Sequence, residues 1–209
     1  MSTPIRANPN RMELMRLGRR LSLARRGHRL LKDKQDELME RFTEAIKDVR
    51  RVREELENLY SDLRESYMAV TYNSGSSALR SYSLRPPIQA EFSGNYVRLM
   101  NLRIPEVHVE FEDRTDDLGP LNLSGAFPGF LKEFRKVGEL SVSLLNAERK
   151  MFVIAGELQK VRRRVNALEH IFMPRLRETI NYITMQLEEM ERENITRLMK
   201  VKDIVRKNK

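Results

Sequence analysis

The chain has 209 residues, of which a third are charged, and it contains no Cys and no Trp. Without Cys, a disulfide framework and thiolate chemistry are excluded. No apolar run approaches the length of a bilayer span, and the first residues lack the apolar core of a signal peptide. We therefore expect a soluble protein of the cytoplasm.

The net charge of +9 is concentrated at the two ends of the chain. Residues 1–34 carry +8 and residues 128–209 carry +7, whereas residues 35–72 carry −4 and residues 73–127 carry −2. The acidic stretch interrupts the continuous basic stripe that a nucleic-acid surface would need. We therefore expect no nucleic acid among the partners.

A heptad repeat predicts the first long helix, from an N-cap at Asn8 or Asn10 to about Tyr72. Its apolar stripe is narrow and the other faces are charged, which is typical of a coiled-coil seam. Gly18 and Gly27 interrupt this helix, either as tolerated weak spots or as points of close approach. The seam consists of Leu14, Leu17, Leu21, Ala24, His28, Leu31, Gln35, Leu38, Phe42, Ala45, Val49, Val52, Leu56, Leu59, Leu63, Ser66 and Val70.

Residues 73–127 cannot form a long helix, because Gly and Pro punctuate them repeatedly, as at Pro86–Pro87 and Gly119–Pro120. Val107, Val109 and Phe111 alternate with polar residues, which predicts a half-buried strand. Residues 96–104 are a second strand candidate, and Pro105 could help to turn one strand into the other. We expect a small central head that contains a β-hairpin.

Residues 128–209 predict the second long helix, again with a coiled-coil seam. Pro174 lies inside the helical pattern, and from there to the end the spacing approaches eleven residues per three turns, so we expect a bend or a straightening at Pro174. The seam consists of Val137, Leu140, Leu144, Ala147, Met151, Ile154, Leu158, Val161, Val165, Leu168, Phe172, Leu176, Ile180, Ile183, Leu187, Met190, Asn194, Leu198, Val201 and Val205.

Two long helices joined by a small head must fold back on each other. The predicted fold class is therefore mainly α, a long antiparallel two-helix coiled coil with a small central head (1–72, 73–127 and 128–209). If both helices end at one tip, the numbers of facing residues sum to about 219. This register sets Glu55 beside Arg164 at flanking positions, and we predict that they approach within reach of an ion pair.

The sequence contains no recognisable pattern of catalytic residues. His28 occupies a seam position, where a polar side chain usually fixes the register. The other two His residues and the helix-face carboxylates form no metal-binding pattern, and no phosphate-binding loop surrounds Gly18 or Gly27. We expect a non-enzymatic protein without a cofactor or a metal.

Two stretches carry more than periodicity. Residues 8–17 (NPNRMELMRL) and 24–39 (ARRGHRLLKDKQDELM) resemble the N-terminal signature of the D subunit of archaeal and vacuolar-type rotary ATPases. Residues 162–169 (RRRVNALE), 173–183 (MPRLRETINYI), 187–192 (LEEMER) and 197–202 (RLMKVK) resemble its C-terminal signature. Both stretches occur in the order and spacing of that family.

The resemblance implies a rotor shaft in the central stalk of an ATP synthase or ATPase. In that family the coiled coil stands inside the hexamer of catalytic A and B subunits, the F subunit binds beside it, and the C subunit couples it to the membrane ring. The protein would thus be peripheral on the cell membrane. Cations of the basic ends would then face the hexamer: Arg11, Arg16, Arg19, Arg20, Arg25, Arg26, Arg162, Arg163, Arg197, Lys200 and Lys202.

An alternative remains open from the residues themselves. A cytosolic coiled-coil adaptor, or a nucleic-acid-binding protein that uses the basic tip, would also be helical, basic and free of catalytic groups. Binding to DNA or RNA that weakens with salt would favour this alternative, whereas co-purification with A and B subunits would exclude it.

Overall fold

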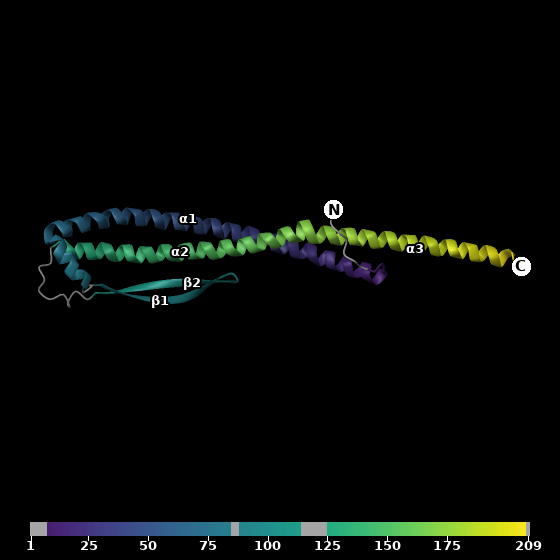
Figure 1. Cartoon of the computed structure of the whole chain (residues 1–209), viewed down its shortest axis with the longest axis horizontal. Coiled ribbons are helices and arrows are strands. Elements are labelled where there is room, and N and C mark those ends of the chain that lie inside the picture. The colour runs from purple at the N-terminus through teal and green to yellow at the C-terminus, as the bar shows by residue number, and fades with distance from the viewer. Residues whose placement is uncertain (1–7, 85–87, 114–124, 208–209) are drawn as a thin grey trace. The chain divides into compact units, whose positions relative to one another are not determined.

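The computed structural model describes residues 8–84, 88–113 and 125–207. In chain order the elements are α1 (Arg11–Leu84), β1 (Ile88–Leu99), β2 (Leu102–Asp113), α2 (Phe127–Ala167), the π-helical turn η2 (Leu168–Phe172) and α3 (Met173–Lys207) (Figure 1). The predicted fold class is confirmed, since long helices flank a single antiparallel hairpin. The predicted breakers Pro86–Pro87 and Gly119–Pro120 lie outside the described residues.

The chain divides into two compact units. Unit 1 combines residues 1–37 with residues 158–209, and unit 2 consists of residues 38–157. In each unit a part of α1 lies antiparallel to a later helix.

Asn10 caps the start of α1, as predicted. The backbone N–H of Met12 donates to Oδ1 of Asn10 at 2.8 Å, which satisfies one of the amides that a helix start leaves without a partner. From there on, every predicted seam position of α1 is buried or half-buried. The buried ones are Leu17, Ala24, Leu38, Ala45, Val49, Val52, Leu56 and Val70.

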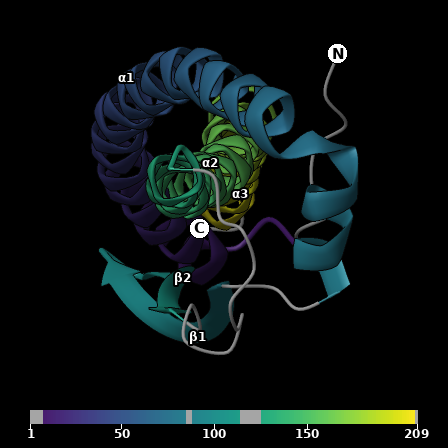
Figure 2. The same ribbon diagram turned by 90° about the vertical axis from the view of Figure 1, so that its left-hand side faces the viewer.

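The break predicted after Tyr72 is a kink at Gly75. Gly75 has φ 74° and ψ 162°, a conformation that is open to glycine but strained for residues with a Cβ atom. Helical structure resumes after the kink and continues to Leu84 in a new direction (Figure 2). The first helix is thus longer than predicted, because one glycine redirects the chain without ending it.

In unit 2, α1 packs against the start of α2 through apolar and aromatic side chains. Val70 and Phe127 are buried against each other, with Phe130 packed on them. The rings of Tyr67 and Phe130 lie 6.1 Å apart. The burial of Val70 and Phe127 stabilises this end of the helix pair.

The hairpin is antiparallel, with Leu99 paired to Leu102 and a turn whose Met100 has a positive φ of 56°. Pro105 does not take part in the turn, contrary to our prediction. It lies inside β2 opposite Tyr96. The backbone of Val107, two residues later, points away from β1, so the nitrogen of Pro105 lies on the same free edge. A proline is tolerated there because no ladder hydrogen bond is lost.

In unit 1, α1 packs against α3 around a core of Leu17, Leu176 and Ile183. The guanidinium of Arg11 pairs with the carboxylate of Glu191, and Nε2 of His28 lies 3.2 Å from Oε2 of Glu169. His28 therefore links α1 to the π-helical turn η2 at a seam position. Its role in setting the register stays a prediction.

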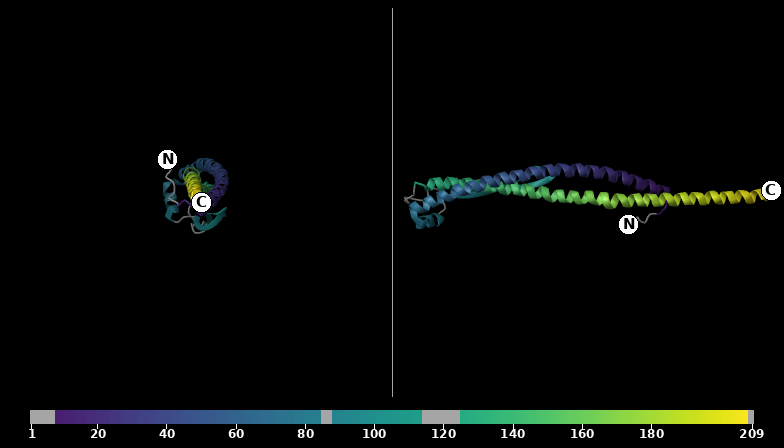
Figure 3. Two further views of the ribbon diagram at one scale, coloured as in Figure 1. Left: turned by 90° about the vertical axis from the view of Figure 1, so that its right-hand side faces the viewer. Right: turned by 90° about the horizontal axis from the view of Figure 1, so that it is seen from above.

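The predicted register is wrong. Facing residue numbers sum to 202 for Arg11 and Glu191 and to 197 for His28 and Glu169 in unit 1, and to 201 for Arg53 and Glu148 in unit 2, instead of about 219. Our prediction assumed that both helices end at one level. In unit 1, however, α3 continues past the first residue of α1 (Figure 3, right). The predicted pair of Glu55 and Arg164 rested on that register and loses its basis.

The seam of the second helix follows the prediction from Val137 to Leu168 and then departs from it. Met173 is buried instead of Phe172, which is 42% exposed. The reason is the π turn η2, in which the N–H of Met173 bonds to the carbonyl oxygen of Leu168. Such a turn takes up one extra residue. The sequence irregularity before Pro174 is thus absorbed at one place, and the regular seam resumes with Leu176.

We predict that Gly75→Ala lowers the free energy of unfolding by about 1–2 kcal/mol, since alanine is strained at this φ. Gly18 lies in regular helix with open space around the site of a Cβ atom. As the matched control, Gly18→Ala should raise the stability by up to about 1 kcal/mol. Chemical denaturation followed by circular dichroism measures both. Equal effects of the two substitutions would contradict the account of the kink.

We predict that removing one residue from the π turn restores a continuous α-helix. Deletion of the exposed Ile171, made together with Pro174→Ala to avoid a proline in the new helix, shortens the step from Leu168 to Leu176 from eight residues to seven, which is one heptad. The stability should then change by less than about 1 kcal/mol. Deletion of Arg163 in the same background turns every later core residue away from the seam, and it should cost several times as much. Thermal unfolding compares the two deletions.

Candidate functional site

The described part of the chain shows neither the pattern of a metal site nor that of a membrane span. Within residues 8–84, 88–113 and 125–207, no group of three or more His, Asp or Glu side chains could hold a metal ion. No helix found there is apolar enough over a sufficient length to cross a membrane. The features that could carry a function are surfaces that could contact another protein.

The predicted cations of α1 lie on the surface of unit 1. Arg11 pairs with Glu191 of α3, and Arg16 pairs with Glu13 one turn earlier, at 2.8 Å. The other four cations are exposed, and none of them has an ion pair to any described residue. These are Arg19, Arg20, Arg25 and Arg26. Their charges are thus available to a partner.

The same part of α1 carries an apolar face that nothing in unit 1 covers. Met12, Leu23 and Leu30 are 72%, 66% and 69% exposed. Their spacing of eleven and seven residues places them on one face of the helix, opposite the seam, and Arg19 and Arg26 lie between them on that face. We call this the outer face of α1. The sequence analysis identified only the seam and missed this face, although the same helical periodicity in the sequence also indicates it.

The predicted cations of the second helix are exposed as well. Arg162 and Arg163 lie at the end of α2, next to the buried Val161. Lys200 and Lys202 lie near the end of α3 without an ion pair to any described residue. Arg197 has only Glu193, one turn earlier on the same helix, at 3.6 Å. None of these cations contributes to the seam.

The last turns of α3 have no partner helix in unit 1. All described residues from Glu188 on are exposed, including the predicted seam residues Met190, Asn194, Leu198, Val201 and Val205. Leu198 is 68% exposed. The prediction that these residues are core is wrong for the chain by itself, because α1 begins at the level of Glu191 and leaves them bare. We call residues 192–207 the bare end of α3.

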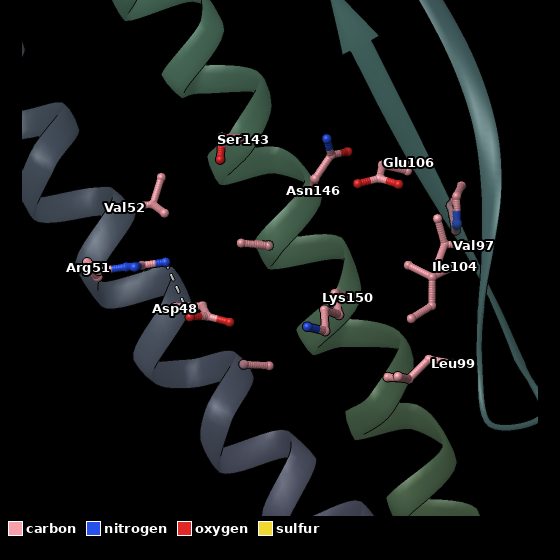
Figure 4. A pocket seen from close by; sticks show the side chains of 13 residues that line it. Asp48, Arg51, Val52, Val97, Leu99, Ile104, Glu106, Ser143, Asn146 and Lys150 are labelled. Carbon is pink, nitrogen blue, oxygen red and sulfur yellow. Dashed lines mark hydrogen bonds and ion pairs between the residues drawn. The ribbon is translucent and has the colours of Figure 1, made fainter.

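In unit 2 the hairpin lies beside α2, and an open cleft of about 330 Å³ remains between the hairpin, α1 and α2 (Figure 4). Val97, Leu99 and Ile104 line it from the hairpin, and Asn146 and Lys150 line it from α2. Asn146 forms two hydrogen bonds with the backbone of Val107. Sequence reasoning missed Asn146, since a lone asparagine on a helix face carries no signal.

Comparisons with known proteins bear on the whole chain. A family model for the D subunit of ATP synthase matches residues 13–203. The V-type ATP synthase D subunit of Acetivibrio thermocellus is 38% identical, with coverage of 96% of this chain and 92% of that protein. For the V-type D subunit of Fusobacterium nucleatum the identity is 38% with 98% of both covered. For the A-type D subunit of Pyrococcus abyssi it is 36%, with 96% and 95% covered.

The two faces of α1 should respond differently to mutation. Leu17→Ala removes a side chain that is 1% exposed in the core of unit 1, so we expect a loss of about 2–5 kcal/mol in the free energy of unfolding. Leu23→Ala, on the outer face, should change it by no more than about 0.5 kcal/mol. Urea unfolding of both variants measures the difference. A large loss for Leu23→Ala would show that the outer face is already covered in the isolated chain.

Proposed function

Because the chain belongs to the family of ATP synthase D subunits, we propose that it is the central rotor shaft of a V/A-type rotary ATPase. In this role it transmits torque between the catalytic sites of a surrounding A and B hexamer and the ring that moves protons or sodium ions across the membrane. The proposal assigns no catalytic step to the chain itself. It places the chain at the membrane through its complex, on the cytoplasmic side.

One observation carries the proposal beyond the family name. The bare end of α3 presents Leu198, Val201 and Val205 to solvent along the line of the seam. Cations outnumber acids in this segment, which holds Arg192, Arg197, Lys200, Lys202, Arg206 and Lys207 against Glu193 and Asp203. An exposed apolar stripe of this length calls for a partner that covers it. A collar of catalytic subunits would provide such a cover.

The chemistry of this surface suits a shaft that turns within a collar. Apolar contact has no preferred direction, so it persists while the surfaces slide. Ion pairs of exposed cations are worth only about 0–1 kcal/mol each, so they can be exchanged at little cost as the shaft turns. The outer face of α1, with Arg19 and Arg26 between apolar residues, offers the same combination. We propose that both surfaces face the A and B subunits, together with Arg162 and Arg163.

The remaining partners are proposed from the same family membership. The F subunit would bind beside the coiled coil, and the C subunit would connect the shaft to the membrane ring. A tagged chain, pulled down from native membranes, should bring A, B, F and C subunits with it. Recovery of the chain with nucleic acid or with unrelated proteins would favour the alternative, an adaptor or a nucleic-acid-binding protein that uses its basic tip.

Truncation of residues 200–209 tests the role of the bare end. We predict that the truncated chain keeps its helical content, because the described residues of this segment are exposed and bury nothing in unit 1. The assembled complex should lose ATP-driven ion pumping relative to its rate of ATP hydrolysis, since the shaft would lose its hold in the collar. Pumping into membrane vesicles and ATP hydrolysis are measured on the same preparation.

Two matched variants separate the contributions of apolar surface and charge. Val201→Ser with Val205→Ser removes the apolar stripe and keeps every cation, whereas Lys200→Gln with Lys202→Gln removes charge and keeps the stripe. We expect the serine pair to impair coupling more strongly than the glutamine pair. Normal coupling in the truncated complex would refute the proposed role of this segment.

A further inference from the structure

The hairpin is attached to α2 by an unusual contact. The backbone N–H of Val107 donates to Oδ1 of Asn146 at 2.9 Å, and Nδ2 of Asn146 donates to the carbonyl oxygen of Val107 at 2.7 Å. An asparagine side chain offers one acceptor and two donors on a planar amide. Asn146 thus pairs with Val107 much as the peptide group of a neighbouring strand would.

This contact uses the free edge of the sheet. Val107 lies opposite Gly94, and since its N–H and C=O both point to Asn146, these two residues form a pair without hydrogen bonds between the strands. The neighbouring residues Glu106 and His108 therefore direct their backbone groups toward β1. The edge of β2 is covered at one residue by a side chain from another element.

Apolar packing forms a second attachment of the hairpin. A Cβ atom on Gly138 would lie only 2.5 Å from Cζ of the Phe111 ring. The close approach of this ring to α2 therefore depends on the absence of a side chain at Gly138. Ile104 is buried near the tip of the hairpin. The other strand, β1, is exposed from Ala90 to Arg98. The open cleft of Figure 4 separates the hairpin tip from α1.

We propose that the hairpin is an arm that can open from α2, and that Asn146 is its latch. The arm is held along one edge by the two amide hydrogen bonds, with the packing of Phe111 on Gly138 as a second attachment.

The test is the substitution Asn146→Leu in the full chain, since leucine has a similar size and can neither donate nor accept. Hydrogen exchange of single amides is followed by NMR. Exchange at Val107 should become about tenfold faster, while the amides of Glu106 and His108, which face β1, should stay within about twofold of their original rates. The ring-current shift that Phe111 produces at Gly138 should weaken in the same variant, because the whole arm moves.

Ser143→Leu serves as the matched control. It places the same apolar side chain one turn earlier on α2, in the lining of the same cleft, and it should change neither readout. Three outcomes would overturn the proposal. Unchanged exchange at Val107 would mean that another contact protects its amide. An unchanged shift at Gly138 would mean that the two hydrogen bonds order only Val107 and do not hold the arm. Equal acceleration at Glu106, Val107 and His108 would mean that the hairpin unfolds instead of opening.

Discussion

The structure depends on the burial of one narrow apolar stripe per helix. In unit 1 that stripe places Leu17 against Leu176 and Ile183, and in unit 2 a stripe of the same kind brings Val70 to Phe127. A stripe two residues wide in every seven buries little area per turn, so stability accumulates only with length. The helices are long for this reason. The seam of unit 1 also contains a polar link, from His28 to Glu169.

Sequence reasoning succeeded where the physics is local. The cap at Asn10, the seam of α1 and the alternation in β2 each follow from residue types at short spacing. The register prediction failed because register is not local. A heptad stripe can match another stripe at any shift of seven residues, and the choice among these shifts depends on how particular side chains pack across the seam, such as Leu17 with Leu176 and Ile183. Equal helix ends were the simplest assumption, and the structure instead leaves one helix longer.

Other features escaped prediction for different reasons. The π turn could not be predicted because Phe172 and Met173 are both apolar and equally suited to a core position. Only packing determines which of the two is buried. The contact between Asn146 and Val107 joins residues 39 positions apart through a single side chain, which no periodicity records. The surfaces that we assign to the A and B subunits are exposed in this chain, so their role depends on partners and not on the fold that the sequence encodes by itself.

The cap at Asn10 has a consequence for the geometry of unit 1. Because α1 and α3 run in opposite directions, each residue added to the start of α1 would cover about one more residue of α3, or ~1.5 Å of helix. The position of Asn10 thus determines the length of α3 that α1 leaves uncovered. Moving the cap one heptad toward the N-terminus would cover about two turns of the bare end. The uncovered length of α3 could therefore be changed by mutations in α1 alone.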